Sequence, residues 1–338
     1  MPAPPLTQRV AEHQRTSHDM GKIAFLFPGQ GSQYSGMGRD LAEKFPESRA
    51  VFEKADAALG FSLFDLCCTG SEESLKQTEN TQPAILTVSI AAYRALEKRG
   101  IVPDFAAGHS LGEYSAVVAA GGLDFSDAVK IVRGRGRYMQ EAVPAGEGAM
   151  AAILGLPPGE VAEICKKAAD HEVVSPANLN SPEQTVISGG AAAVKRAVEI
   201  ASQSGAKRAV MLPVSAPFHC AMMAPAQKRL EADLRAAKFS ALKFPVITNV
   251  DAEAITTGEE AREALIRQVT QPVRWLESIH EMIEAGVTIF VEVGPGKVLT
   301  GLLRQIDRSI RACNVEDSAS LEAALEKIAQ SRADAAEG

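Results

Sequence analysis

The sequence predicts an α/β protein in which a parallel sheet forms the main body and a smaller lobe is inserted. Two observations lead to this prediction. From Lys22 to about residue 310, apolar segments typical of buried strands alternate with helix-like segments, as in proteins with parallel sheets. From Ala149 the order changes to βαββαβ, which is the order of the ferredoxin-like fold.

The first part of the chain supplies the early strands and helices of the main sheet. Lys22–Phe27 (KIAFLF) is a strand-like run that ends at Pro28-Gly29, and Asp104–Ala107 is a second short strand. Pro83 suits the first turn of a helix, and Gly121-Gly122 ends another. The helix-like segments are Met37–Leu59, Thr81–Arg99, Leu111–Ala120 and Phe125–Glu141.

The middle of the chain contains the six elements of the inserted lobe. In order they are a strand at Ala149–Leu154, a helix at Pro158–Ala169, strands at Val173–Asn178 and Gln184–Ser188, a helix at Ala191–Ser204 and a strand at Ala209–Leu212. A split-βαβ unit of this kind is compact by itself and can interrupt a larger domain. We therefore place a ferredoxin-like subdomain at residues 148–213.

After the lobe, the chain returns to the α/β pattern and ends in a helix. The expected elements are strands at Phe244–Asn249 and Val287–Val293 and helices at Glu259–Val269, Trp275–Ala285 and Leu321–Gln330. The predicted organisation is a disordered extension at residues 1–20, a core of residues 21–147 and 214–310, the subdomain at 148–213, and a C-terminal helix and tail at 311–338.

Composition and charge narrow the class of protein. The chain has 338 residues, 46% of them hydrophobic, which is enough to bury a large core. A net charge of −7, with basic residues scattered among acidic ones, argues against nucleic-acid binding and polybasic membrane anchoring. We find no signal peptide, no apolar run approaching the roughly 18 residues of a membrane span, and no C-x-x-C pair among five cysteines. We therefore expect a cytoplasmic monomer with free thiols, no metal and no cofactor.

The segment Gly108-His109-Ser110-Leu111-Gly112 fits the G-x-S-x-G nucleophile elbow. It lies between a predicted strand and a predicted helix, which is the context that such an elbow requires. The flanking glycines let a sharp turn expose the hydroxyl of Ser110. The segment therefore nominates Ser110 as a nucleophile, although a small residue in a tight turn would produce the same pattern.

A serine nucleophile needs a base, and His219 is the best candidate among six histidines. His109 adjoins Ser110 too closely to accept its proton, and the other four lie in polar or terminal segments. His219 follows Pro217 and Phe218 in a loop where the chain leaves the inserted lobe, and clefts form at such junctions. The alternative is a buried core histidine. Because no acid stands out as a third member, a backbone carbonyl is expected to orient the ring.

The loop after the first strand, FPGQGSQ, is a candidate oxyanion hole. The peptide N–H of Leu111, directly after the nucleophile, is the usual first donor, and Gln30 is well placed to supply the second. A dinucleotide loop is excluded here because Tyr34 occupies the position of the third glycine. Gly294-Pro295-Gly296-Lys297 lacks the spacing and the hydroxyl of a phosphate-binding loop.

Three arginines, Arg133, Arg135 and Arg137, lie close together on one helix-like segment. They could form a solvated face. Alternatively, one of them points inward and binds a carboxylate through its bidentate guanidinium, which would let a serine enzyme select dicarboxylic acyl groups. The pattern alone does not choose among the three.

Several motifs in a fixed order resemble those of malonyl-CoA:acyl-carrier-protein transacylases. They are FPGQGSQ, GHSLGE, a central arginine, SAPFH, NVDA and EVGPGKVLTGLL, and together they span about Gly21 to Ile310. The resemblance implies an α/β-hydrolase-like core with a ferredoxin-like insert. It also implies ping-pong transfer of malonyl from malonyl-CoA to the phosphopantetheine thiol of acyl carrier protein, through a malonyl-serine ester, for fatty-acid chain extension.

The resemblance further assigns roles to individual residues. Ser110 is the nucleophile and His219 its base, the backbone amides of Gln30 and Leu111 form the oxyanion hole, and Arg135 binds the malonyl carboxylate. The main-chain carbonyl of Gln268 would hold the histidine ring. The pocket-lining positions implied are Met139, Asn180 and Phe218, and Phe218 before the histidine favours malonyl over methylmalonyl. Alternatives are a freestanding polyketide-type acyltransferase, a serine (thio)esterase and a noncatalytic module that docks carrier protein.

Overall fold

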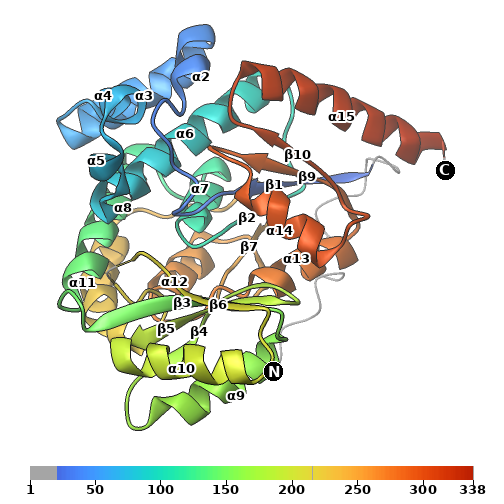
Figure 1. The fold of residues 1–338 in the computed structure, drawn as a ribbon. Helices are drawn as coiled ribbons and strands as arrows, with labels where there is room; N and C mark the ends of the chain where they lie inside the picture. The colour runs from blue at the N-terminus through green and yellow to red at the C-terminus, as the bar shows by residue number, and fades with distance from the viewer. Residues whose placement is uncertain (1–20, 215, 338) are drawn as a thin grey trace.

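The computed structural model describes residues 21–214 and 216–337 and consists of a large α/β body and a smaller lobe below it (Figure 1). The predicted extension at residues 1–20 lies outside the described residues. In the described part of the chain, no helix is both long and apolar enough to cross a membrane.

The large body is built on a six-stranded sheet. Its strands, in spatial order, are β10 (Arg311–Val315), β9 (Val287–Val293), β1 (Lys22–Phe27), β2 (Phe105–Gly108), β7 (Val246–Ile247) and β8 (Ala254–Ile255). All neighbours pair in parallel except β7 and β8, which are antiparallel. The predicted parallel α/β sheet is confirmed, with one short antiparallel strand added at the edge.

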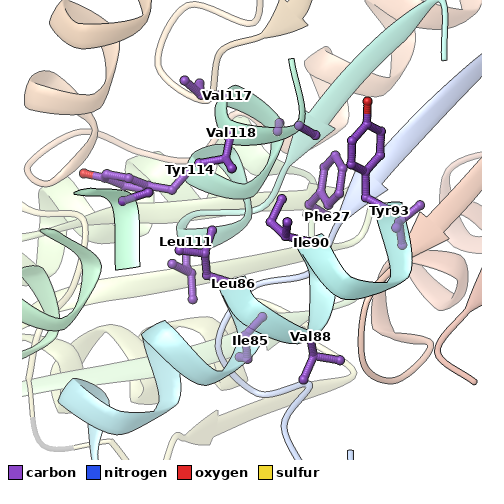
Figure 2. Close-up of a cluster of buried hydrophobic side chains, with 14 of the residues drawn as sticks. Phe27, Ile85, Leu86, Val88, Ile90, Tyr93, Leu111, Tyr114, Val117 and Val118 are labelled. Carbon is purple, nitrogen blue, oxygen red and sulfur yellow. The ribbon is translucent and has the colours of Figure 1, made fainter. Parts of the chain in front are cut away.

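The central strand β1 divides the hydrophobic core into two layers. Its side chains alternate between the faces of the sheet, as the pleat requires. Ile23, Phe25 and Phe27 pack into the larger core, and Ala24 and Leu26 pack into the smaller core on the opposite face. Figure 2 shows the larger core around Phe27, where side chains of two helices meet.

The helices of the larger core all follow β1 and come from several parts of the chain. They are α2 (Arg39–Lys44), α3 (Pro46–Leu59), α4 (Leu63–Thr69), α5 (Glu72–Lys76), α6 (Thr78–Lys98), α7 (Leu111–Ala119), α8 (Phe125–Glu141), α11 (Ala224–Ala236), α12 (Gly258–Gln268) and α15 (Ser318–Glu337). The smaller core is covered by α13 (Trp275–Glu284) and α14 (Val298–Ile306), and a 3-10 turn, η1 (Ala221–Met223), precedes α11.

The smaller lobe has the βαββαβ order that the sequence predicts. It comprises β3 (Gly148–Leu154), α9 (Pro158–Ala169), β4 (Val174–Ser181), β5 (Gln184–Gly190), α10 (Ala191–Gln203) and β6 (Arg208–Met211). The antiparallel sheet runs β4-β5-β3-β6, which is the ferredoxin-like strand order. Because strand side chains alternate, Ile153 faces the two helices, whereas Met150 faces Leu212 and Phe218 on the other side.

Backbone hydrogen bonds join the lobe to the large body. The amide of Leu179 on β4 donates to the carbonyl of Val273, at 2.9 Å, and the amide of Val273 donates to the carbonyl of Ala177, at 2.8 Å. Val273 lies two residues before α13, so these bonds hold β4 of the lobe against the large body.

Several elements differ from the sequence-based expectation. The single helix predicted at Met37–Leu59 is two helices, because Pro46 has no N–H to continue the first and instead begins the second. The helix containing Pro83 begins at Thr78, so the proline lies inside it. The sheet extends beyond residue 310, where we placed the end of the core, since β10 forms its edge.

Candidate active site

The central feature of the site is the turn between β2 and α7. Ser110 occupies this turn with φ 52° and ψ −105°, a backbone conformation that residues other than glycine rarely adopt. A Cβ added at Gly108 would lie 1.9 Å from the carbonyl carbon of Gly112, and one added at Gly112 would lie 2.0 Å from the carbonyl oxygen of Phe27. Both positions therefore require glycine, as the elbow pattern indicates, and Ser110 lies at the carboxyl end of β2.

His219 lies beside the serine. Its Nε2 is 2.7 Å from Ser110 Oγ, and its Nδ1 is 2.9 Å from the main-chain oxygen of Gln268. Because a carbonyl oxygen only accepts hydrogen bonds, Nδ1 carries the proton and Nε2 is free to accept the serine proton. Burial, and then the charge of Arg135, lower the pKa of His219 to about 3. The ring is therefore a neutral base at physiological pH.

Arg135 enters the site from α8 and is 1% exposed. Its Nη2 donates to Ser110 Oγ at 3.2 Å and to Gln268 Oε1 at 2.9 Å, while Nη1 donates to Gln82 Oε1 at 2.9 Å. The guanidinium also lies over the ring of Tyr114, 5.5 Å from its centroid. A cation is thus held next to the nucleophile by neutral groups and an aromatic face.

The other two arginines of the helix point elsewhere. Arg133 packs over the ring of Phe61, and Arg137 over that of Tyr138. Helical spacing explains the difference, since Arg135 shares the buried face of α8 with Val132 and Met139, three residues before it and four after it. Of the three candidates, only Arg135 contacts Ser110.

The proposed oxyanion donors also surround the serine. Leu111 begins α7, so its N–H is one of the helix-terminal donors without an intrahelical acceptor. Gln30 follows β1, and both residues line the cavity into which Ser110 points. The positive end of the helix dipole faces the same point, which favours developing negative charge.

The cavity beside Ser110 is small, about 140 Å³, and its lining combines reactive and apolar side chains. Met139, Met150 and Phe218 provide apolar walls from α8, β3 and the loop before His219. Gln30 and Phe218 also border a wider cleft of about 560 Å³, through which a longer substrate can reach the serine. The cavity is therefore formed by both the large body and the inserted lobe.

Asn180 has a different environment from the pocket-lining position that the resemblance implied. Its Oδ1 lies 2.8 Å from His109 Nε2, and the cavity lining includes Asn178 in its place. Both asparagines are on β4. The ring of His109 in turn packs edge-on against Trp275, with centroids 5.5 Å apart, so His109 supports the turn and does not act on Ser110.

Three buried polar residues make hydrogen bonds within the site, although the sequence analysis did not identify them as site residues. Asn249 Oδ1 accepts from the amide of Ser110 at 2.7 Å, and its Nδ2 donates to the carbonyl of Gly108 at 2.7 Å. Gln82 accepts from Arg135, and Glu113 accepts from Gln268 Nε2 at 2.8 Å. Asn249 begins the NVDA motif and Glu113 ends GHSLGE, so motif membership was the one signal available for these two.

Among the described residues, the hydrogen bonds around Ser110 and Arg135 involve no cysteine, although Cys220 directly follows His219 in the chain. All five cysteines are buried and unpaired. Across residues 21–214 and 216–337, no three His, Cys, Asp or Glu side chains are grouped so that they could hold a metal ion.

Comparison with known proteins identifies the family of the chain. Residues 24–327 match the acyl transferase domain family. The malonyl CoA-acyl carrier protein transacylase of Bacillus subtilis is 49% identical over 310 residues, which are 91% of this chain and 98% of that protein. The transacylase structure from Coxiella burnetii superposes with a TM-score of 0.90 at 46% identity, covering 92% of this chain and 99% of the other.

A further similar structure contains a partner. A malonyl-transacylase in complex with its holo type II PKS acyl-carrier protein superposes with a TM-score of 0.88 at 47% identity. The match covers 90% of this chain and 99% of that one.

The lowered pKa of His219 predicts how the reactivity of Ser110 depends on pH. The neutral ring persists to lower pH than an ordinary histidine, because its pKa is about 3 and not 6.5. The rate at which a neutral phosphonofluoridate modifies Ser110 should therefore stay nearly constant from pH 8 down to pH 5, as followed by intact-protein mass spectrometry. Burial raises the pKa of the nearby Glu113 carboxyl to about 7, so Glu113→Gln is the control that removes this second titrating group. An inflection near pH 6.5 that persists in Glu113→Gln would contradict the assignment of His219 as the base.

Proposed function

This chain belongs to the acyl transferase family, among the malonyl-CoA:acyl carrier protein transacylases, and we propose that Ser110 is the residue that carries the malonyl group. The group would pass from the thiol of CoA to Ser110 and from there to the phosphopantetheine thiol of acyl carrier protein. The protein transfers malonyl from malonyl-CoA to acyl carrier protein. The single observation that best supports this role of Ser110 and those of its neighbours is the buried Arg135 guanidinium beside the Ser110 hydroxyl.

In the first half-reaction, Ser110 Oγ attacks the thioester carbon of malonyl-CoA. Its proton moves to His219 Nε2, which is 2.7 Å away, and the Gln268 carbonyl stabilises the resulting imidazolium through Nδ1–H. The tetrahedral intermediate collapses when its carbon–sulfur bond breaks. The leaving thiolate takes the proton from His219, and malonyl-Ser110 remains.

The backbone amides of Gln30 and Leu111 stabilise the oxygen that becomes negatively charged in each tetrahedral intermediate. Such donors are fixed before the reaction, so they need no reorganisation when the charge develops. Losing one of them would cost roughly 3 to 4 kcal/mol in the barrier.

In the second half-reaction, the phosphopantetheine thiol of acyl carrier protein attacks the ester. His219 accepts the thiol proton and returns it to Ser110 Oγ as the ester bond breaks. The cleft next to the cavity offers a path for this long arm. Carrier binding is supported by the similar malonyl-transacylase that forms a complex with its acyl-carrier protein. We propose fatty-acid chain extension as the use of the product, and a type II PKS carrier is the alternative that this complex favours.

Arg135 holds the malonyl carboxylate throughout both half-reactions. In the structure its donors face neutral oxygens of Gln82, Gln268 and Ser110, none of which satisfies its charge. A substrate carboxylate would supply the missing negative charge through a bidentate pair. The same pair would hold the acyl group beside Ser110, so an acyl chain without a carboxylate would bind less well.

Removal of the nucleophile tests the covalent route. In Ser110→Ala, transfer of labelled malonyl from malonyl-CoA to holo acyl carrier protein should fall by at least about 10³-fold, because residual binding and the oxyanion donors cannot form the ester. Ser204→Ala, which changes an exposed serine on the lobe, is the control. A Ser110→Ala protein that transfers malonyl at the normal rate would show that another group is the nucleophile.

Removal of the guanidinium tests the selection of malonyl. In Arg135→Ala, kcat/KM for malonyl-CoA should fall by about 100-fold or more, because a buried charged pair with the substrate is lost. The value for acetyl-CoA should hold or rise, since acetyl has no carboxylate. Arg133→Ala, two residues away on the same helix, should leave the ratio unchanged. Equal losses for both substrates in Arg135→Ala would exclude a role in selection.

A further inference from the structure

Glu113 is a fully buried acidic residue, 0% exposed, that takes no part in the steps above. It lies in the first turn of α7, three residues after Ser110. We propose that Glu113 is a positioning residue that fixes the side-chain amide of Gln268 and thereby holds Arg135 ready for the substrate carboxylate. This inference rests on the role proposed for Arg135.

The hydrogen bonds of Gln268 show how this positioning would work. Its Nε2 donates to Glu113 Oε2 and to the carbonyl of Ser110, each at 2.8 Å, whereas its Oε1 accepts from Arg135 Nη2 at 2.9 Å. The ionised carboxylate of Glu113 can only accept, so the NH₂ end of the Gln268 amide must face it. The oxygen end then faces Arg135. With the amide reversed, the NH₂ group would face the guanidinium, and donor would meet donor.

The amide direction is maintained in both protonation states of Glu113. Burial is the main cause that raises the pKa of Glu113 to about 7. Oε2 already accepts from Gln268 Nε2 and from the amide of Asn249, at 2.8 and 3.1 Å, whereas Oε1 has no hydrogen-bond partner among the described residues. A proton would therefore reside on Oε1, and Oε2 would remain an acceptor.

The placement of Gln268 between Glu113 and Arg135 also leaves the arginine available. None of the ion pairs in the described part of the chain involves Arg135. A carboxylate in direct contact with the guanidinium would compete with the malonyl carboxylate for the same donors. With the amide between them, Glu113 still offsets the buried positive charge, because the two groups interact electrostatically. Arg135 remains on the wall of the cavity beside Ser110, where a substrate carboxylate can reach it.

Two substitutions of Glu113 separate its role as an acceptor from its charge. Glu113→Gln keeps an oxygen where Oε2 accepts, so the kcat/KM ratio of malonyl-CoA to acetyl-CoA should stay within about twofold of the unmodified protein. Glu113→Met fills similar space without an acceptor, and the same ratio should fall by about tenfold or more, because the Gln268 amide then loses one of its two acceptors at 2.8 Å and is less firmly held.

A double substitution shows whether the effect passes through Arg135. In an Arg135→Ala background, Glu113→Met should change the malonyl-to-acetyl ratio by less than about twofold, since the group that it positions is gone. Thermal unfolding of each variant and formation of acetyl-Ser110 from acetyl-CoA verify that the protein is folded and the nucleophile intact. These two readouts also distinguish failure of this proposal from failure of the proposed covalent route.

The proposal is overturned by either of two results. One is a Glu113→Met protein that is folded, forms the acyl-serine and keeps the normal malonyl-to-acetyl ratio. The other is an equal loss of that ratio in Glu113→Gln and Glu113→Met, which would mean that the charge of Glu113 matters and its hydrogen bond to Gln268 does not.

Discussion

A guanidinium buried beside the nucleophile is the constraint on which the rest of the site depends. Removing the Arg135 charge from water is costly unless hydrogen bonds and nearby charge compensate it. The compensation comes from Gln82 on α6, Tyr114 on α7 and Gln268 on α12, with Glu113 offsetting the charge at longer range. These helices all pack on one face of the six-stranded sheet, so the larger core assembles the environment that an isolated α8 could not provide.

The same charge links substrate recognition to the base. Arg135 contributes to the lowered pKa of His219, second only to burial. A substrate carboxylate that pairs with Arg135 would cancel much of this repulsion and would raise the pKa of His219 toward that of an ordinary histidine. His219 would then be a stronger base when malonyl is bound than when the site is empty. This coupling gives a physical reason why Ser110 would be more strongly activated when an acyl group with a carboxylate is bound.

The sequence predicted the parts of the site whose residues have strong local constraints. The glycines around Ser110 are required by backbone contacts of about 2 Å, so the elbow was visible as a pattern. The choice of Arg135 depended on the resemblance, because three arginines fit the pattern equally. Glu113 was missed because a buried glutamate in a helix reads like any solvated one until its partners are known. Short elements such as β8 and α5 were missed because their periodicity covers too few residues.

In the proposed reaction, one serine holds malonyl as an ester until a carrier thiol removes it. Intact-protein mass spectrometry after brief exposure to malonyl-CoA, followed by peptide mapping, detects this ester. We expect one malonyl group per chain, located on Ser110, that persists in buffer and is discharged when holo acyl carrier protein is added. An adduct on another residue, or one that is lost to water as fast as to the carrier thiol, would contradict the proposed reaction.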